Sequence, residues 1–340
     1  MSAQGEGRLR AYLHFIAAVI WFFMARSMAH RGAVALANEQ WVPLAEQLFL
    51  AFLLVAGYAG MGFWLNRQLQ AVSEQGWPLR EGWRREAGLG VALGWSLAVL
   101  CVLPMALLGG IALSVATRSS AWAWLLADLL FFALMALVEE VAFRGYGFQR
   151  FTHAVGGPGA ALGFAAFYAV VQAQLPGASR LSVGVSVLLS LGLSMAYLRT
   201  RALWVSWGIN FGWKASRGIL FGLAVSGVNS HSPIVQGDPM GPFWLTGGGF
   251  GLDGSWVALL ALIAALPVIY RITRDLDYRY NAPVLVPGGI PVDIDAAARS
   301  AHEAAMGPAT PSAPQMVLQI LPAASESALS AENSAPTLEE

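Results

Sequence analysis

Apolar residues run in long blocks along most of the chain and do not alternate with polar ones. A helix needs roughly 20 apolar residues to cross the hydrocarbon core of a bilayer. The blocks predict membrane-spanning helices at about 11–29, 42–65, 89–116, 121–143, 158–175, 181–198, 202–225 and 255–272. The pattern therefore predicts an all-α fold, a polytopic membrane bundle of about eight transmembrane helices.

Composition agrees with a membrane location for most of the chain. Of the 340 residues, 56% are hydrophobic and only 12% are charged, whereas soluble domains carry about 25% charged residues. Twenty basic residues balance twenty acidic ones, so the chain lacks the positive charge that a nucleic-acid-binding protein requires. The single cysteine, Cys101, allows neither an intrachain disulfide nor a thiolate metal cluster. We expect membrane lipid as a partner and no nucleic acid.

The two ends of the chain differ from its apolar middle. The first block could be a secretory signal, since Ala35-Leu36-Ala37 has the small-x-small form of a cleavage site, but Arg26 and Arg31 lie between the block and that site. After Tyr280 the sequence is rich in Ala, Pro and Ser without periodicity. We expect residues 1–280 to form a transmembrane domain and 281–340 a disordered cytoplasmic tail.

Arginine is unevenly distributed between alternate connecting segments. One set of segments holds 13 arginines, the other holds four, and the loop 227–254 holds none. Cytoplasmic loops carry the excess of basic residues. We therefore expect both termini in the cytoplasm, with the protein in the plasma (inner) membrane. The larger set is Arg8, Arg10, Arg67, Arg80, Arg84, Arg85, Arg144, Arg150, Arg199, Arg201, Arg271, Arg274 and Arg279.

Ionisable side chains lie within or beside these blocks, where they are energetically expensive and mark candidate functional sites. Three acids and three bases stand out, namely Asp128, Glu139, Glu140, Arg144, Lys214 and Arg217. The simplest interpretation is that they pair with one another and hold the bundle together. The spacing also indicates a shared helix face, because Asn210, Lys214 and Arg217 form one polar stripe at i, i+4 and i+7 of a helix.

The two adjacent glutamates are suited to different tasks. Glu140 and Arg144 are four residues apart and can pair on one helix face. Glu139 points about 100° away from Glu140, so one carboxylate can contact a cation while the other faces a water-filled cavity. Tyr168 and Gln172 form a weaker polar stripe on another helix. Neighbouring carboxylates in a site of low dielectric suit general base chemistry.

The run from Glu139 to Arg144 resembles the EExxxR motif of the CAAX prenyl endopeptidase and bacteriocin-processing (CPBP, or abortive-infection) family, which are intramembrane glutamate endopeptidases. The resemblance covers roughly 120–256. Two further family motifs are altered, because Tyr168 to Gln172 stands where the family has FxxxH, and Asn210 to Lys214 stands where it has HxxxN.

The resemblance implies roles for the matching positions. Glu140 matches the water-activating base, and Glu139 and Arg144 match its supporting pair. Gln172 replaces the histidine that helps to activate water, so it can hold a water without taking its proton. Asn210 and Lys214 are both hydrogen-bond donors and can still stabilise an oxyanion.

Other membrane proteases fit the sequence less well. The five histidines include no HExxH, which excludes a site-two zinc protease. No serine and histidine pair presents itself for rhomboid chemistry, and Asp128 is the only aspartate clearly within a span, which argues against an aspartate pair. His153 and His231 are expected at the interface and in a solvated loop. Trp213, beside Lys214, is expected to pack in the core.

We therefore expect a CPBP-type intramembrane endopeptidase that hydrolyses a peptide bond with a glutamate-activated water, without a metal or other cofactor. Its substrate would be a protein or peptide at the cytoplasmic side of the membrane. The main alternative is a catalytically inactive membrane interaction or regulatory protein with the same fold. A transporter is a weaker alternative, because no broken half-helices recur in the two halves of the chain.

Overall fold

The computed structural model describes residues 3–66, 75–115, 121–231, 234–280, 284–285 and 291–292. The chain divides into two compact units, residues 1–281 and 282–340. In the second unit two short strands, β3 (Val284–Leu285) and β4 (Pro291–Val292), pair antiparallel. The rest of the expected tail lies outside the described residues.

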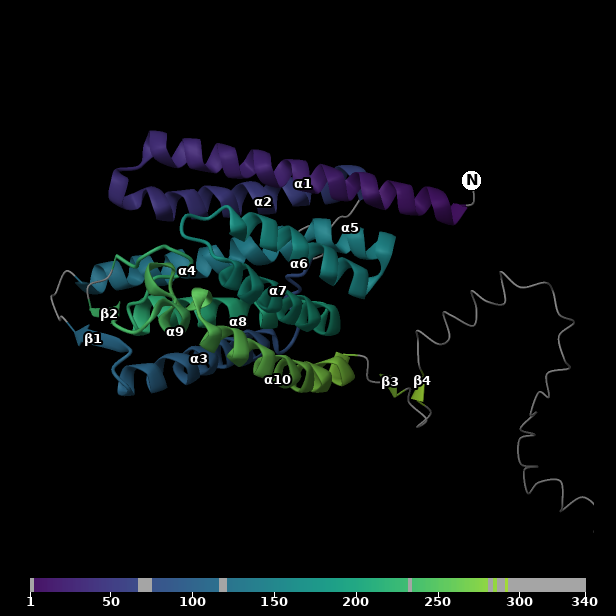
Figure 1. Cartoon of the computed structure of the whole chain (residues 1–340). Helices are drawn as coiled ribbons and strands as arrows, with labels where there is room; N and C mark the ends of the chain where they lie inside the picture. The colour runs from purple at the N-terminus through teal and green to yellow at the C-terminus, as the bar shows by residue number, and fades with distance from the viewer. Residues whose placement is uncertain are drawn as a thin grey trace, which may run out of the picture. The chain divides into compact units, whose positions relative to one another are not determined.

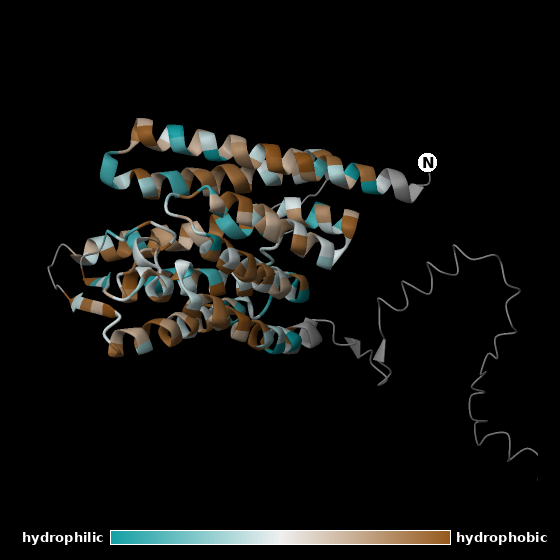
Figure 2. Ribbon diagram, in the orientation of Figure 1, coloured by the Kyte–Doolittle hydropathy of each residue, from teal (hydrophilic) through white to brown (hydrophobic). Residues whose placement is uncertain are grey.

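Six helices in the described part of the first unit are long and apolar enough to cross a membrane. Figure 1 shows the long helices lying roughly side by side, and Figure 2 shows that hydrophobic colours dominate them. The chain is an integral membrane protein with an all-α polytopic fold. The spanning elements are α1 (Ala3–Leu36), α2 (Val42–Asn66), α3 (Trp83–Leu107), α4 (Ala121–Arg144) continued by α5 (Tyr146–Val155), α7 (Arg180–Thr200) and α10 (Trp256–Tyr280).

The two remaining apolar blocks form shorter helices. α6 (Gly157–Ala173) has 17 residues and α8 (Trp204–Ala215) has 12. At 1.5 Å per residue, α8 alone is too short to cross a bilayer. A π-helical turn, η3 (Ser216–Leu220), extends it, and the chain then leaves the helix, so the block 202–225 does not form one continuous span.

The block 89–116 is also shorter as a helix than predicted. α3 ends at Leu107, three residues after Pro104, and the chain continues as β1 (Ile111–Val115). β1 pairs antiparallel with β2 (Val235–Pro239), which lies in the loop 227–254. The loop 227–254 also contains α9 (Phe243–Thr246), η4 (Gly248–Phe250) and η5 (Leu252–Gly254). A further short helix, η1 (Glu39–Trp41), precedes α2.

The reversal between α5 and α6 lies further along the chain than the apolar blocks suggest. Backbone hydrogen bonds from Gly145 to Val141 and from Gln149 to Gly145 carry the helix from α4 into α5. Gly156, with φ 83°, then reverses the chain into α6. Such a backbone conformation favours glycine.

α3 and α8 touch through their backbones. A Cβ atom added at Gly90 or Gly94 of α3 would meet backbone atoms of α8, and one added at Gly208 or Gly212 would meet backbone atoms of α3. Both pairs have the GxxxG spacing that brings membrane helices together without intervening side chains. We call these four residues the glycine seam.

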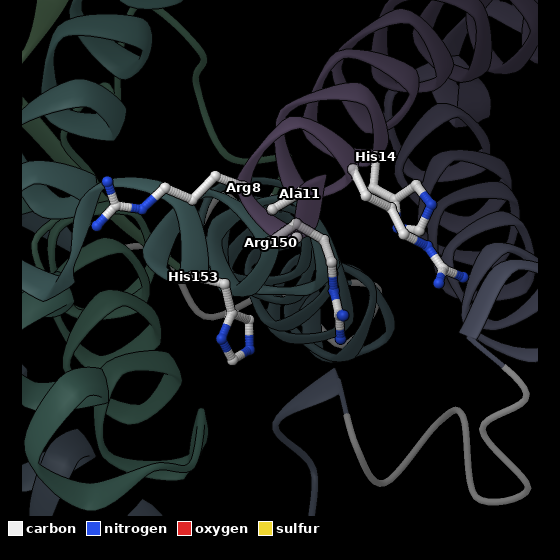
Figure 3. Close-up of a pocket in the computed structure, with 7 residues that line it drawn as sticks. Arg8, Ala11, His14, Arg150 and His153 are labelled. Carbon is white, nitrogen blue, oxygen red and sulfur yellow. The ribbon is translucent and has the colours of Figure 1, made fainter. Parts of the chain in front are cut away.

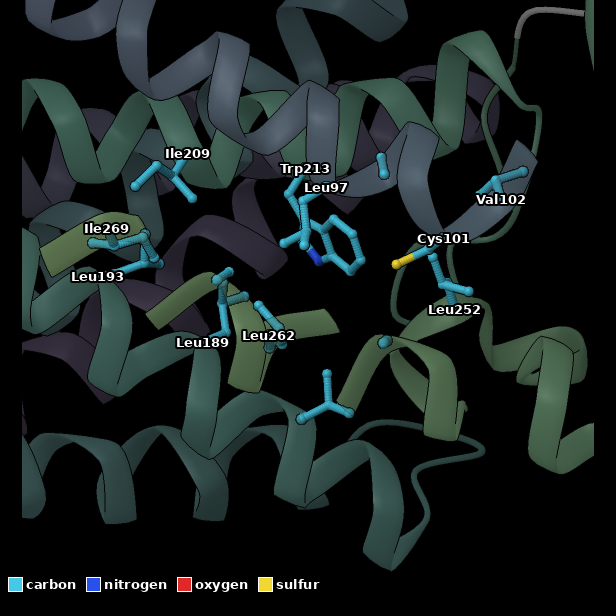
Figure 4. Packing of buried hydrophobic residues seen from close by; sticks show 14 of the residues in the cluster. Leu97, Cys101, Val102, Leu189, Leu193, Ile209, Trp213, Leu252, Leu262 and Ile269 are labelled. Atoms are coloured by element: carbon cyan, nitrogen blue, oxygen red, sulfur yellow. The ribbon is translucent and has the colours of Figure 1, made fainter. Parts of the chain in front are cut away.

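Side chains fill the space on either side of α8. α1 and α2 form an antiparallel hairpin that packs on α4 and α5, and Figure 3 shows the end of α1 beside α5. On the other side, Trp213 and Cys101 pack among residues from α3, α7 and α10 such as Leu97, Leu189 and Leu262 (Figure 4). The helix that carries the polar stripe thus lies between the two apolar cores.

Candidate active site

The adjacent carboxylates of α4 lie in different surroundings. Glu140 is fully buried, with an exposed fraction of 0%, whereas 12% of the Glu139 side chain is exposed. The 100° rotation between neighbouring helical residues separates them. One carboxylate is therefore enclosed by protein, and the other borders free space.

Glu140 is held by two donors. Arg144 Nη1 donates to its Oε1 at 2.9 Å, and Asn210 Nδ2 donates to the same oxygen at 3.1 Å. The guanidinium also donates to the carbonyl and hydroxyl oxygens of Ser190 on α7, at 3.3 and 3.2 Å. The expected Glu140–Arg144 pair is thus present, and it ties α4 to both α7 and α8.

Glu139 accepts hydrogen bonds from two other helices. Lys214 Nζ of α8 lies 2.9 Å from Oε1, while Asn210 Nδ2 and Tyr168 Oη donate to Oε2 at 2.9 and 3.2 Å. Lys214 is almost completely buried, so its ammonium compensates the charge of Glu139 where the dielectric is low. Tyr168 was not predicted as a site residue from the sequence. Its i, i+4 spacing to Gln172 was the sequence feature that could have identified it.

A cavity of about 340 Å³ opens in front of Glu139. Tyr168 and Gln172 of α6 also line it, together with mainly apolar residues of α1, α2 and α4 such as Phe22, Leu50 and others. Glu140, Asn210 and Lys214 are not among the described residues that line it. Of the expected site residues, only Glu139 and Gln172 therefore line the cavity. Asn210 and Lys214 bind Glu139, whereas Glu140 and Arg144 pair with each other.

The position of Gln172 follows from the late reversal of the chain. With a reversal directly after Arg144, Gln172 would lie near the far end of its helix, at a different depth from Glu139. The reversal at Gly156 instead leaves Glu139 and Gln172 at nearly equal separations in sequence from the turn. Both residues can therefore line one cavity.

A second buried ion pair involves Arg217, which lies in η3 about one turn after Lys214 of α8. Arg217 Nη1 lies 2.7 Å from Asp253 Oδ1, and the guanidinium carbon lies 4.2 Å from the centre of the Trp213 ring. Trp213 Nε1 and Ser226 Oγ also donate to Asp253. Burial favours a higher pKa for Asp253, but Arg217 and Lys214 outweigh it and hold the pKa below its usual value.

This pair corrects one expectation from the sequence. Arg217 was grouped with the glutamates of α4, but its acidic partner is Asp253 of η5. The reason is the π-helical turn at Ser216, which ends the regular helix on which the i, i+7 stripe was drawn. No sequence signal distinguished Asp253 within its glycine-rich loop.

Asp128 also lies apart from the glutamates. It is eleven residues, or about 16 Å of helix, before Glu139. Its Oδ1 accepts hydrogen bonds from the backbone N and from Nδ1 of His231, at 3.0 and 2.9 Å. The ring of His231 stacks on Trp124. His231 is therefore a packed partner of Asp128 and not a fully solvated loop residue as expected.

Metal binding has no evident site in this region. The described residues contain no group of three or more His, Cys, Asp or Glu side chains that could hold an ion. His153 lines a different cavity, near the N-terminal end of α1. The chemistry that the site offers is that of a carboxylate with amide, phenol and ammonium donors around it.

Residues 119–216 match the family model described as type II CAAX prenyl endopeptidase Rce1-like. This segment of the chain is similar to that family. The segment is less than a third of the 340 residues, but it spans α4 to α8 and includes every residue chosen from the sequence for the site. The match confirms the resemblance drawn from the EExxxR motif, and it ends before the expected boundary at 256. The chain matches no curated protein and no solved structure.

Proposed function

We propose that the protein is an intramembrane endopeptidase of the CAAX-protease type that hydrolyses a peptide bond with a glutamate-activated water. The family match supports the class of enzyme. The observation that carries the mechanism is the position of Glu139, an anchored carboxylate on the wall of a largely apolar cavity within the bundle. A general base must be able to contact the water from which it takes a proton.

We assign the role of base to Glu139, whereas the family resemblance pointed to Glu140. Glu140 is fully buried and is not among the described residues that line the cavity. Glu139 borders the cavity, where a water can reach it. In this proposal Glu140 and Arg144 position α8 against α4, and their role is indirect.

The reaction then follows from ordinary carboxylate chemistry. Glu139 accepts a proton from the water as its oxygen bonds to the scissile carbonyl carbon, and the protonated Glu139 gives that proton to the leaving amine as the C–N bond breaks. Two side-chain amides line the cavity, Gln47 and Gln172. We assign the hydrogen bond to the developing oxyanion to Gln172, which lies on α6 one turn after Tyr168. Asn210 and Lys214, expected as oxyanion donors, hold Glu139 in place instead.

The arginine distribution supports an orientation for this activity. With both termini in the cytoplasm, the continuous α4–α5 helix reaches the cytoplasmic side at its C-terminal end, where Arg150 lies, and Glu139 lies near the middle of this helix. We propose that the substrate is a membrane-bound protein or peptide that enters from this side, in the plasma (inner) membrane.

The test is a cleavage assay with purified protein and a panel of membrane-protein substrates. Glu139→Gln should lower the cleavage rate by about 10²–10⁴-fold, because the amide cannot accept the proton. Glu46→Gln is the matched control, since Glu46 lines the same cavity outside the Glu139 network. Equal cleavage by Glu139→Gln and the parent would rule out the assignment.

Chelators test the absence of a metal. EDTA should leave the cleavage rate unchanged, because carboxylates alone make a poor site for zinc at these positions. Loss of activity in EDTA that zinc restores would contradict the proposed mechanism.

A non-catalytic membrane protein is the second candidate, favoured by the Lys214–Glu139 ion pair at 2.9 Å. The pair occupies one oxygen of the proposed base, and no histidine is present among the described residues that line the cavity. The triple change Gln172→His, Asn210→His and Lys214→Asn restores the family pattern. Increased cleavage would indicate a degenerate protease, whereas no cleavage by either folded protein would favour the non-catalytic candidate.

A further inference from the structure

A second cavity, of about 630 Å³, lies between the N-terminal end of α1 and the C-terminal end of α5. Its polar lining is Arg8, Arg10 and His14 from α1 with Arg150 and His153 from α5. Figure 3 shows Arg150 and His153 extending in the same direction from α5, with Arg8 and His14 of α1 to either side. No carboxylate is among the described residues that line it. We call this space the basic cavity.

The excess of arginine on one side of the membrane does not by itself explain the basic cavity. Other arginines of the same set are used within the fold. Arg80 pairs with Glu86 at 2.7 Å, and Arg199 donates to Thr273 at 3.1 Å. Some residues of the basic cavity also have partners in the fold, since Arg10 donates to the Leu65 carbonyl and Arg150 lies over the Tyr146 ring. The basic cavity differs in that three guanidinium groups and two imidazoles from two helices line one space. Such a concentration of donors, without a carboxylate among them, favours an anionic ligand.

Exposed apolar side chains lie beside this cavity. On the same turns of α1, Leu9 and Leu13 are 51% and 56% exposed, as expected for side chains that face acyl chains. A neighbouring cavity of about 600 Å³ shares His153 and adds Arg201. Cationic groups thus lie beside an apolar surface at one end of the bundle.

We propose that the basic cavity binds a phosphate group, supplied by an anionic phospholipid or by a soluble phosphate compound. The guanidinium fork matches the oxygens of a phosphate, and charge-assisted hydrogen bonds of this kind are strong. The exposed apolar surface of α1 favours the lipid as the source. The site is separate from the Glu139 cavity and does not depend on proteolysis.

Native mass spectrometry of the full chain in a neutral detergent measures this binding directly. The probes are short-chain phosphatidic acid, phosphatidylcholine, oleate and inorganic phosphate. Phosphatidic acid should bind most tightly, because its phosphate carries the largest exposed charge, and oleate tests whether a carboxylate suffices. Inorganic phosphate, added as a competitor, tests whether a soluble ligand can occupy the site.

The decisive variants differ only in where two charges are removed. Arg8→Gln/Arg10→Gln should weaken phosphatidic acid binding by at least about tenfold. Arg84→Gln/Arg85→Gln, which removes two other exposed arginines of the same set in the first turn of α3, should change it by less than about twofold because these residues do not line the basic cavity. Arg150→Gln should weaken binding in the same way as the first pair.

Each outcome either tests whether the basic cavity binds phosphate or identifies the source of the phosphate. Selective binding of phosphatidic acid that inorganic phosphate does not displace would support the lipid. Binding of inorganic phosphate that displaces the lipid, with the same dependence on Arg8 and Arg10, would support a soluble ligand. Equal binding of oleate and phosphatidic acid, or equal loss in the two double variants, would show a general effect of surface charge and overturn the proposal.

Discussion

Two buried ion pairs occupy successive helical turns in this protein, and Asp253 of the second pair is not among the described residues that line the Glu139 cavity. Lys214 contacts Glu139 at 2.9 Å, and Arg217 contacts Asp253 at 2.7 Å. Glu139 faces the cavity together with Gln172, whereas Asp253 is enclosed by donors from the protein. A buried charge in a membrane protein is thus not sufficient evidence of a catalytic site. Access of a carboxylate to water is the more discriminating criterion.

The largest effect on stability is expected at the enclosed pair. Arg217→Met leaves Asp253 charged and without its cation, and should lower the free energy of unfolding by about 3–5 kcal/mol. Arg217→Met/Asp253→Leu removes both charges and should recover most of this loss. Denaturant unfolding in detergent measures all three proteins. A loss below about 1 kcal/mol for the single variant would show that the pair contributes little.

A smaller loss is expected at the pair that borders the cavity. Lys214→Met should lower the free energy of unfolding by about 2–3 kcal/mol, because Glu139 keeps its bonds from Asn210 and Tyr168 and can be hydrated from the cavity. The same unfolding assay gives the comparison with Arg217→Met. If the Lys214 variant were the less stable of the two, the contrast between an enclosed and an accessible pair would fail.

The glycine seam supports both pairs, because it fixes α8 against α3. Gly94→Ala would bring a Cβ against backbone atoms of α8 and should lower the free energy of unfolding by about 1–2 kcal/mol. Gly88→Ala is the matched control on the same helix, since a Cβ there would have no neighbour within 4 Å. Thermal unfolding of the two variants side by side gives the difference. Equal stability would mean that α3 and α8 can separate without cost.

The smallest effect concerns pH. The pKa of Asp253 is lower in the folded protein than its usual value, so its stabilising contribution is complete above about pH 4 and is lost as the pH falls through the folded-state pKa. The stability difference between the parent and Arg217→Met/Asp253→Leu should therefore be constant from about pH 5 to 8 and change only in stronger acid. Thermal unfolding as a function of pH measures it. A change that begins near pH 6 would assign the dependence to another group.

The sequence predicted the helical bundle because long apolar blocks are a direct consequence of bilayer thickness. It also predicted that Glu139, Glu140, Arg144, Asn210 and Lys214 would lie together, since periodicity and the family motif both concern residues on neighbouring faces. These predictions use local spacing, which hydropathy and motifs record well.

Features that depend on contacts between distant segments could not be predicted in the same way. The partner of Arg217 is Asp253, which lies in a loop without a periodic pattern. Which glutamate faces the cavity depends on the rotation of α4 against α6, and spacing along one helix does not determine this rotation. The glycine seam was visible as two GxxxG spacings, but only the structure shows that they face each other.

The contact of backbone against backbone also determines which parts of the protein can move. Side chains between two helices can change rotamer and let the helices slide, but α3 and α8 have none at the glycine seam. We therefore expect these two helices to behave as one rigid body that carries Asn210 and Lys214. The opposite wall of the Glu139 cavity includes Phe22 and Leu50 of the α1–α2 hairpin, which packs through side chains. A gate wide enough for a peptide to enter from the lipid would then be the hairpin, and the residues that hold Glu139 would stay fixed while it opens.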